Sequence, residues 1–373
     1  MQSDSFFHKF YYQWWKNIDK SIFIIISLLF IIGLFFSLVS TSLIASDKLD
    51  TNSYFFFFKH LIYVLLGIFI IFIFSSLSTD QLIKYSIILF FMSFISLFLV
   101  PIIGVEVKGS RRWIDLFFLP RFQPVEILKP FLIIILATIL CSKRSHILLK
   151  YSISLILISI VSLLLIIQPD IGQTLLVVFS WAVIIFTSGI NIYFLITISF
   201  LVLTLLAYLV IYVPKFDYIQ GRIFSFFNKG AGSHNFQSDK AIESITSGGF
   251  FGKGIGEGTL KNRVPEAHTD YIISVISEEF GVVAIMLILL LFLIFIYMVF
   301  KKIRVEINDK IKLILIGSIS LILMQTTIHI GVNIRLFPTT GMTLPFLSYG
   351  GSSIVSTSIL AGIILNLTKR KIN

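Results

Sequence analysis

Three titratable side chains, Glu266, His268 and Asp270, occupy alternate positions just before a long apolar run. Glycine fills every second position from 252 to 258, and this pattern lets a backbone turn and approach a ligand closely. Side chains of these types can accept or donate a proton. If the apolar run is a helix from residue 270, Asp270 stands in its first turn, where the helix dipole favours a carboxylate. Catalysis and helix capping are therefore both open for Asp270.

A second group of charged residues precedes the apolar run at 124–141. Arg111 and Arg112 adjoin Trp113, and paired arginines can clamp phosphate oxygens bidentately. A membrane-interface belt is the alternative for all three residues. Glu126 and Lys129 are spaced to meet on one helical face, where they can form an ion pair.

Other polar residues lie inside apolar runs. Glu278 and Glu279 are intramembrane carboxylates, a type that is costly and usually functional, although a structural salt bridge is favoured for Glu279. Gln325, His329 and Asn333 recur every fourth residue, so they form one stripe that faces the bundle interior and favours interhelical hydrogen bonds. A proton-relay role for His329 is the alternative. Gln168-Pro-Asp170 precedes the next apolar run, and Asp170 is interpreted as a structural cap.

The elements that position these residues are transmembrane helices. The chain has 373 residues, of which 57% are hydrophobic and 13% charged, with mean hydropathy +0.97, and a soluble protein of this length cannot bury so much apolar surface. Several uncharged runs reach the roughly 20 residues needed to cross a bilayer. The sequence predicts an all-α polytopic membrane protein of about ten helices, near 21–44, 54–77, 82–103, 124–141, 150–167, 171–189, 192–213, 270–299, 311–333 and 350–368.

We predict a single membrane domain over residues 1–373, with two non-helical stretches on the outer side. One is a long extracytoplasmic loop from about 214 to 269. The other, 337–351, is apolar but contains two prolines and three glycines, and such backbone is tolerated at membrane depth only when it is buried or lines a wet cavity. Basic residues outside the two candidate functional loops lie mostly on the side of the termini, so the positive-inside rule predicts cytoplasmic termini.

Several functional classes are excluded or disfavoured. The net charge of +11 is divided among short loops, which indicates anionic membrane lipid rather than nucleic acid as the basic residues' partner. The single cysteine, Cys141, excludes a disulfide framework within the chain and a cysteine-based zinc cluster. The glycine spacing superficially matches a dinucleotide fingerprint, but no strand precedes it.

Taken together, four segments resemble the SEDS family (shape, elongation, division and sporulation), which are polytopic peptidoglycan glycosyltransferases. They are Lys108–Ile114 with Gln123–Lys129, Gln168–Gly172, Gly252–Gly281 and Pro338–Ser353. The segments Gln237–Ser244 and Val264–Asp270 are closer to the division branch than to the elongation branch. The family usually has Ser where Val125 stands and Leu where Val264 stands, which puts a polar role at position 125 in doubt.

The resemblance implies the substrate lipid II, a disaccharide-peptide on undecaprenyl diphosphate, which is polymerised at the outer face of the bacterial cytoplasmic (inner) membrane during division. It implies Asp270 as the catalytic base, because it matches the family's essential aspartate. Arg111 and Lys129, with or without a divalent cation (Mg or Mn), would hold the diphosphate, and Glu126 would orient Lys129 or shape the acceptor side. Substrate-binding positions are also expected at Arg112, Trp113, Glu266, His268 and Ser352.

The resemblance also implies partners: a class B penicillin-binding protein at the septum and other membrane proteins of the division machinery. A lipid II flippase is the first alternative, but such a carrier should contain matched broken helices, and only 337–351 is strongly broken. A non-catalytic division scaffold is the second, and it requires Asp270 to be replaceable.

Overall fold

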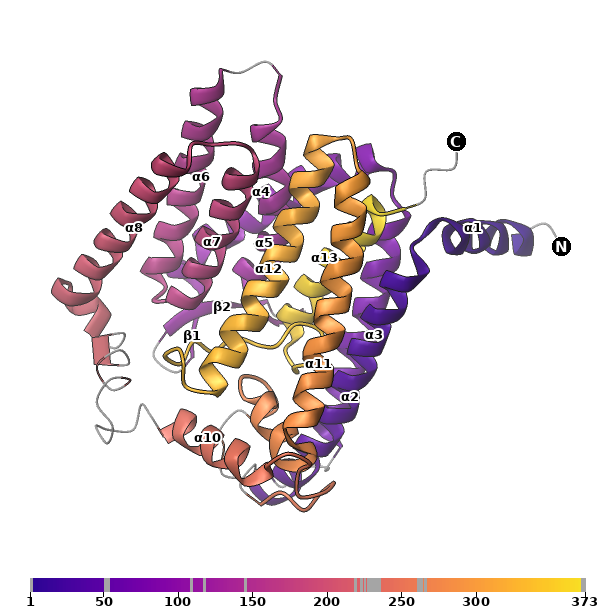
Figure 1. Cartoon of the computed structure of the whole chain (residues 1–373), viewed down its shortest axis with the longest axis vertical. Helices are drawn as coiled ribbons and strands as arrows, with labels where there is room; N and C mark the ends of the chain where they lie inside the picture. The colour runs from indigo at the N-terminus through magenta and orange to yellow at the C-terminus, as the bar shows by residue number, and fades with distance from the viewer. Residues whose placement is uncertain are drawn as a thin grey trace.

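The computed structural model describes residues 3–49, 54–107, 110–116, 119–143, 146–217, 220–221, 224, 226, 236–259, 264 and 267–369. Within them, ten apolar helices run up and down a bundle (Figure 1). They are α2 (Lys20–Leu49), α3 (Phe55–Ser76), α4 (Thr79–Ile103), α5 (Pro124–Leu140), α6 (Ile147–Ile167), α7 (Ile171–Thr187), α8 (Ile192–Tyr212), α11 (Ile272–Val305), α12 (Asp309–Asn333) and α13 (Gly351–Leu367). The predicted helices are thus confirmed, with ends that differ by a few residues.

The distribution of side chains is that of a multi-pass membrane protein. Six of these helices, α2, α3, α4, α6, α11 and α12, are long and apolar enough to cross a membrane, and α7, part of α8, and α13 are shorter apolar helices. On α3 the buried residues include His60 and Ser75, whereas Ile62 and Phe69 are exposed. Large apolar side chains therefore face outward and polar ones inward, as a bilayer solvent requires.

Helices α5, α12 and α13 form the centre of the bundle, because most of their residues are buried. Helix α5 contacts α4, α7, α12 and α13, and α12 contacts α7 and α11. Helix α1 (Ser3–Asn17) and the last turn of α13 both lie at the end of the bundle where α3 ends, which we call the terminal end, and the β-strands and α10 lie toward the opposite end (Figure 1). Helix α8 lies at the margin beside α7, with most of its described side chains exposed.

The loops at the end opposite the terminal end contain more regular structure than the sequence predicted. The stretch 214–269 was expected to be non-helical, but it holds a 3-10 turn, η1 (Pro214–Phe216), and helix α10 (Phe236–Gly248). The buried residues of α10 are small and recur at helical spacing (Ser238, Ala241, Ser244 and Gly248), so α10 can pack closely on α11. Its low apolar content concealed it, because small residues give little hydrophobic periodicity.

A small β-sheet and an additional helix were not predicted. Strands β1 (Val105–Val107), β2 (Ser110–Leu116) and β3 (Leu119–Phe122) form an antiparallel sheet in the order β1-β2-β3 between α4 and α5. Helix α1 (Ser3–Asn17) precedes the first span and is anchored by Trp14, whose Nε1 donates to Ser75 Oγ at 2.8 Å.

The glycine-rich segment after α10 is inserted into a kink in α11. Gly281 has non-helical angles (φ 76°, ψ −178°) inside α11, and Lys253 N and Gly254 N donate to the carbonyls of Glu278 and Glu279 at 2.9 and 3.0 Å. A Cβ at Gly252 would lie 2.1 Å from Glu279 O. Gly252 therefore permits the close approach of this segment to α11.

This packing predicts that Gly281→Ala is strongly destabilising. An added Cβ would lie 2.1 Å from the Phe250 carbonyl oxygen and would also carry the strain of positive φ. Gly256→Ala is the matched control, because Gly256 also has positive φ (84°) but nothing within 4 Å of the added atom. We expect Gly256→Ala to cost only about 1–2 kcal/mol of unfolding free energy and Gly281→Ala clearly more, measured by thermal unfolding in detergent. Equal costs would contradict the steric account.

Candidate active site

Asp270 lies in the turn that leads into α11. The helix begins at Ile272 with Tyr271 at the N-cap position, so the expectation that Asp270 stands in the first helical turn is wrong: the helix starts two positions later. The side chain is partly buried, and a Cβ at Gly341 would lie 3.6 Å from its Oδ2. The broken segment 337–351 therefore passes directly beside the Asp270 carboxylate.

The polar stripe of α12 holds this arrangement together. Gln325 Nε2 donates to Thr343 O at 3.0 Å, and His329 Nδ1 lies 2.7 Å from Met342 O. Asn333 Nδ2 donates to the backbone carbonyl of Asp270 at 3.0 Å. The stripe thus faces the interior, as predicted, and it positions the broken segment and the Asp270 turn by hydrogen bonds to backbone.

Arg112 is the arginine that reaches the bundle. Side chains alternate along β2, so Arg112 and Ile114 point inward while Arg111 points outward. Arg112 Nη1 lies 3.6 Å from Asp170 Oδ1, its Nε donates to Gln168 O at 3.3 Å, and its Nη2 donates to Pro169 O. Arg111 instead lies 3.5 Å from Glu106 Oε2, with its side chain 55% exposed.

Asp170 has both the structural role expected of it and a place in the site. Its side chain accepts from Gln173 N at 3.4 Å as the N-cap of α7, and Gln123 Nε2 donates to its Oδ2 at 2.9 Å. Burial raises the pKa of Asp170 above its ordinary value, and the Arg112 guanidinium opposes that shift.

Glu126 and Lys129 form a buried network at the start of α5. Lys129 Nζ lies 2.9 Å from Glu126 Oε2, so the predicted pairing is present. The same ammonium donates to Gln173 Oε1 at 2.9 Å and to Gln325 Oε1 at 3.5 Å, and Gln173 Nε2 donates to Glu126 Oε1 at 2.6 Å. Lys129 is fully buried, so it reaches a diphosphate only if this network opens. Gln173 and Gln325 connect the network to α7 and α12.

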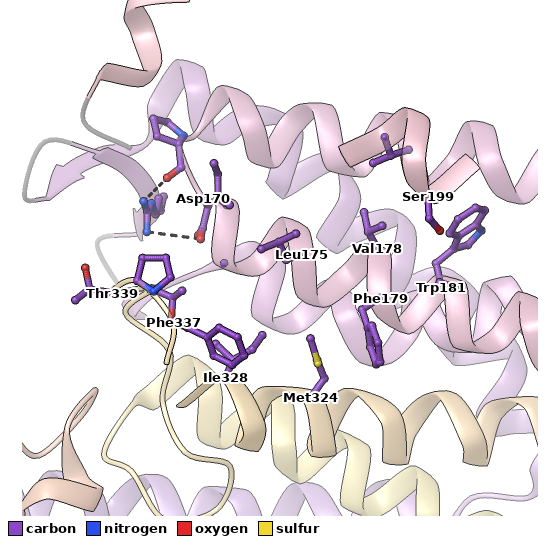
Figure 2. Close-up of a pocket in the computed structure, with 18 of the residues that line it drawn as sticks. Asp170, Leu175, Val178, Phe179, Trp181, Ser199, Met324, Ile328, Phe337 and Thr339 are labelled. Atoms are coloured by element: carbon purple, nitrogen blue, oxygen red, sulfur yellow. Dashed lines mark hydrogen bonds and ion pairs between the residues drawn. The ribbon is translucent and has the colours of Figure 1, made fainter. Parts of the chain in front are cut away.

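An apolar pocket of about 340 Å³, the Arg112 pocket, begins at the Arg112–Asp170 pair and runs between α7, α8 and α12. Figure 2 shows Asp170 and Thr339 at one end and Trp181 and Ser199 at the other, with Leu175, Ile328 and Met324 between them. Thr340 also lines it and contacts α7, because a Cβ at Gly172 would lie 3.0 Å from Thr340 Cβ. Thr340 thus lines the Arg112 pocket, and the next residue, Gly341, lies beside the Asp270 carboxylate.

Three of the remaining predicted site residues contact neighbouring parts of the protein. The ring of His268 lies 4.9 Å from Phe56 and 5.7 Å from Tyr349, between centroids. Trp113 is partly buried and pairs with Val105 in the sheet, and Ser352 Oγ accepts from Gln123 N at 3.0 Å. Glu266 lies outside the described residues.

The intramembrane carboxylates are held by the glycine-rich segment and α10. Glu278 is paired with Lys253 (Oε1–Nζ 3.3 Å) and accepts from Ser244 Oγ at 2.9 Å. Glu279 Oε2 accepts from Gly256 N at 2.9 Å. Both acids therefore hold α10 and the glycine-rich segment in place beside the kink in α11.

The carboxylates near the pocket are already matched with cations. Glu126 is paired with Lys129 and Asp170 with Arg112, and no three His, Cys, Asp or Glu side chains gather as a metal site in the described part of the chain. In the described part of the chain, the positive charges beside these two carboxylates are thus the side chains of Arg112 and Lys129.

The fold and site define a polytopic helical membrane protein with an apolar-walled pocket that is cationic at Arg112. Residues 340–341 connect this pocket to Asp270. The chain belongs to the FtsW/RodA/SpoVE family of cell cycle proteins, whose family model matches residues 19–373. The family resemblance is thereby confirmed.

Known relatives match over nearly the whole chain. A probable peptidoglycan glycosyltransferase FtsW of Caulobacter vibrioides is 30% identical over 363 residues, which cover 96% of this chain and 91% of the relative. The corresponding protein of Coxiella burnetii is 33% identical over 341 residues, covering 88% and 90%.

Solved structures share the fold. The rod shape determining protein RodA of Thermus thermophilus matches with a TM-score of 0.68 and 26% identity, over 94% of this chain and 96% of that chain. A chain from a peptidoglycan synthase complex that coordinates polymerization and crosslinking matches with a TM-score of 0.74 and 24% identity, covering 94% and 97%.

Proposed function

We propose that this protein is a peptidoglycan glycosyltransferase that polymerises lipid II at the outer face of the cytoplasmic membrane during division. The FtsW relatives support this activity by name. The observation that carries the proposal is the 340–341 segment, where Thr340 lies on the Arg112 pocket and Gly341 beside Asp270. Residues 340–341 thereby connect the Arg112 pocket to the Asp270 carboxylate.

The chemistry needs one base and a cationic site for the leaving group. Asp270 takes the proton of the acceptor sugar's 4-hydroxyl as that oxygen bonds to C1 of the donor sugar. The bond from C1 to the diphosphate oxygen breaks, and the diphosphate leaves as a stable anion, so a general acid is dispensable. This differs from glycosidases, which need two carboxylates.

Arg112 holds the departing diphosphate in this proposal, because it is the cation that lines the pocket. The apolar walls beyond it accept part of the polyprenyl chain. Lys129 and Glu126 fix the starts of α5 and α7 behind this site through Gln173, and Lys129 contributes positive potential. Arg111, on the exposed side of β2, is placed to meet the substrate's outer portion.

The two neighbouring arginines provide a direct test. Arg112→Ala should lower kcat/KM for lipid II polymerisation by about 10- to 100-fold, because a charge-assisted hydrogen bond contributes about 1.5–3 kcal/mol. Arg111→Ala should change it by about threefold or less, since its exposed ion pair with Glu106 contributes little. Steady-state kinetics on both variants measures this. If Arg111→Ala is the more damaging variant, the diphosphate lies on the outer face of β2.

The proposal extends to partners and location. The structural match within a peptidoglycan synthase complex supports pairing with a class B penicillin-binding protein. Septal location, cytoplasmic termini and contacts with other division proteins belong to the same proposal. Co-purification of the full chain with the transpeptidase tests the pairing.

A further inference from the structure

A second cavity, of about 1100 Å³, lies at the terminal end of the bundle, far along the helices from Asp270. It is formed where α5 and α7 end and α6 and α12 begin. Four lysines line it: Lys143, Lys150, Lys310 and Lys312. We call it the basic cavity.

The charge in this cavity is unbalanced. Among the described residues that line it, Asp309 is the only acid, and its Oδ1 lies 3.5 Å from Lys312 Nζ. Three lysines remain beyond that pair. Thr187 and Ser188 also line the cavity, but their hydroxyl groups donate to the backbone carbonyls of Val183 and Ile185, so the lysines are the groups that would bind an anion.

The basic cavity adjoins an apolar one. This inner apolar pocket, of about 590 Å³, lies between α6, α7 and α8 and is lined by residues such as Leu155, Ile185 and Leu195. Gly189 lines both cavities, and the Ser188 Oγ–Tyr151 OH contact (3.4 Å) joins a residue of one to a residue of the other. The basic cavity and the inner apolar pocket are thus neighbours that meet at Gly189.

We propose that an anionic phospholipid of the leaflet on this side is bound here, with its phosphate among the lysines and an acyl chain in the inner apolar pocket. Basic pockets between transmembrane helices on the cytoplasmic side bind anionic head groups in this way. A free phosphate would contact the same lysines but would lack the contacts of an acyl chain in the adjoining apolar pocket, so we expect it to bind much more weakly than the lipid. The site is separate from the one that carries the proposed activity.

Cys141 provides a probe that requires no engineering. It is the chain's only cysteine, it is partly exposed, and it lines the basic cavity beside Asp309, Lys310 and Lys150. Its alkylation by a maleimide is measured on the full chain in nanodiscs of phosphatidylcholine, with and without phosphatidylglycerol. We expect phosphatidylglycerol to slow the reaction in proportion to occupancy, and glycerol 3-phosphate to leave it unchanged.

The lysines are tested with charge-matched variants. Lys150→Gln/Lys310→Gln should weaken phosphatidylglycerol binding about 25-fold in native mass spectrometry titrations, because each lysine contributes about a factor of five near an anionic lipid. Lys84→Gln/Lys301→Gln removes the same charge from exposed positions at the same end, outside the cavity, and should leave binding within about twofold of wild type. Leu155→Trp, which fills the inner apolar pocket, should also weaken lipid binding.

Three results would overturn the proposal. Equal losses in the two double variants would show only general attraction to a charged membrane. If glycerol 3-phosphate protects Cys141 as completely as the lipid does, the basic cavity is a site for a free phosphate. Unchanged lipid affinity in Leu155→Trp would exclude the acyl-chain position.

Discussion

Asp270→Asn is expected to reduce lipid II polymerisation by about 10²–10⁴-fold, the usual contribution of a positioned general base. The amide keeps the size of the carboxylate but cannot take the acceptor's proton. The variant keeps the hydrogen bond that Asn333 donates to the backbone carbonyl of residue 270. Gel analysis of labelled glycan strands measures the rate, and thermal unfolding verifies the fold.

Asp115→Asn is the matched control for this prediction. Asp115 is an exposed carboxylate on β2, paired with Arg121 at 2.7 Å, so its loss should leave polymerisation nearly unchanged. If Asp270→Asn polymerises like wild type, the base is another group and the scaffold interpretation gains support.

Lys129→Met is expected to produce the largest loss of stability. It leaves Glu126 buried without its cation and removes the donor to Gln173 and Gln325. Removing one partner of a buried ion pair costs about 3–5 kcal/mol. Lys240→Met is the control, because Lys240 pairs with Glu243 at the same spacing but nearer the surface, where such pairs contribute about 0–1 kcal/mol.

A double variant separates stability from substrate binding. Glu126→Gln/Lys129→Met removes both charges, so it should recover much of the lost stability, as replaced buried ion pairs often do. If the positive potential of Lys129 stabilises the departing diphosphate, the folded double variant should still polymerise at least about 10-fold more slowly than wild type. Recovery of full activity would limit Lys129 to a structural role.

The helical framework could be predicted because each span is a long uncharged run bounded by polar residues. The Glu126–Lys129 pair and the stripe at Gln325, His329 and Asn333 followed from helical spacing alone. These features depend on neighbours within one helix, where sequence distance determines spatial distance.

The rest depends on contacts between distant segments. The short strands between α4 and α5 were not predicted, and without β2 the alternation that turns Arg112 inward and Arg111 outward could not be seen. Gln173 joins Lys129 from another helix, which spacing cannot indicate. Helix α10 was missed because its packing face is made of small residues, and the insertion of the glycines into α11 requires the kink at Gly281.

The most direct test of the account is a polymerisation assay on the wild-type chain. The purified protein, reconstituted into proteoliposomes with its transpeptidase partner, is given fluorescent lipid II, and glycan strands and lipid II flipping are measured in the same samples. The account predicts glycan strands that disappear in Asp270→Asn. Flipping of lipid II without any strand formation would contradict it and identify the protein as a transporter.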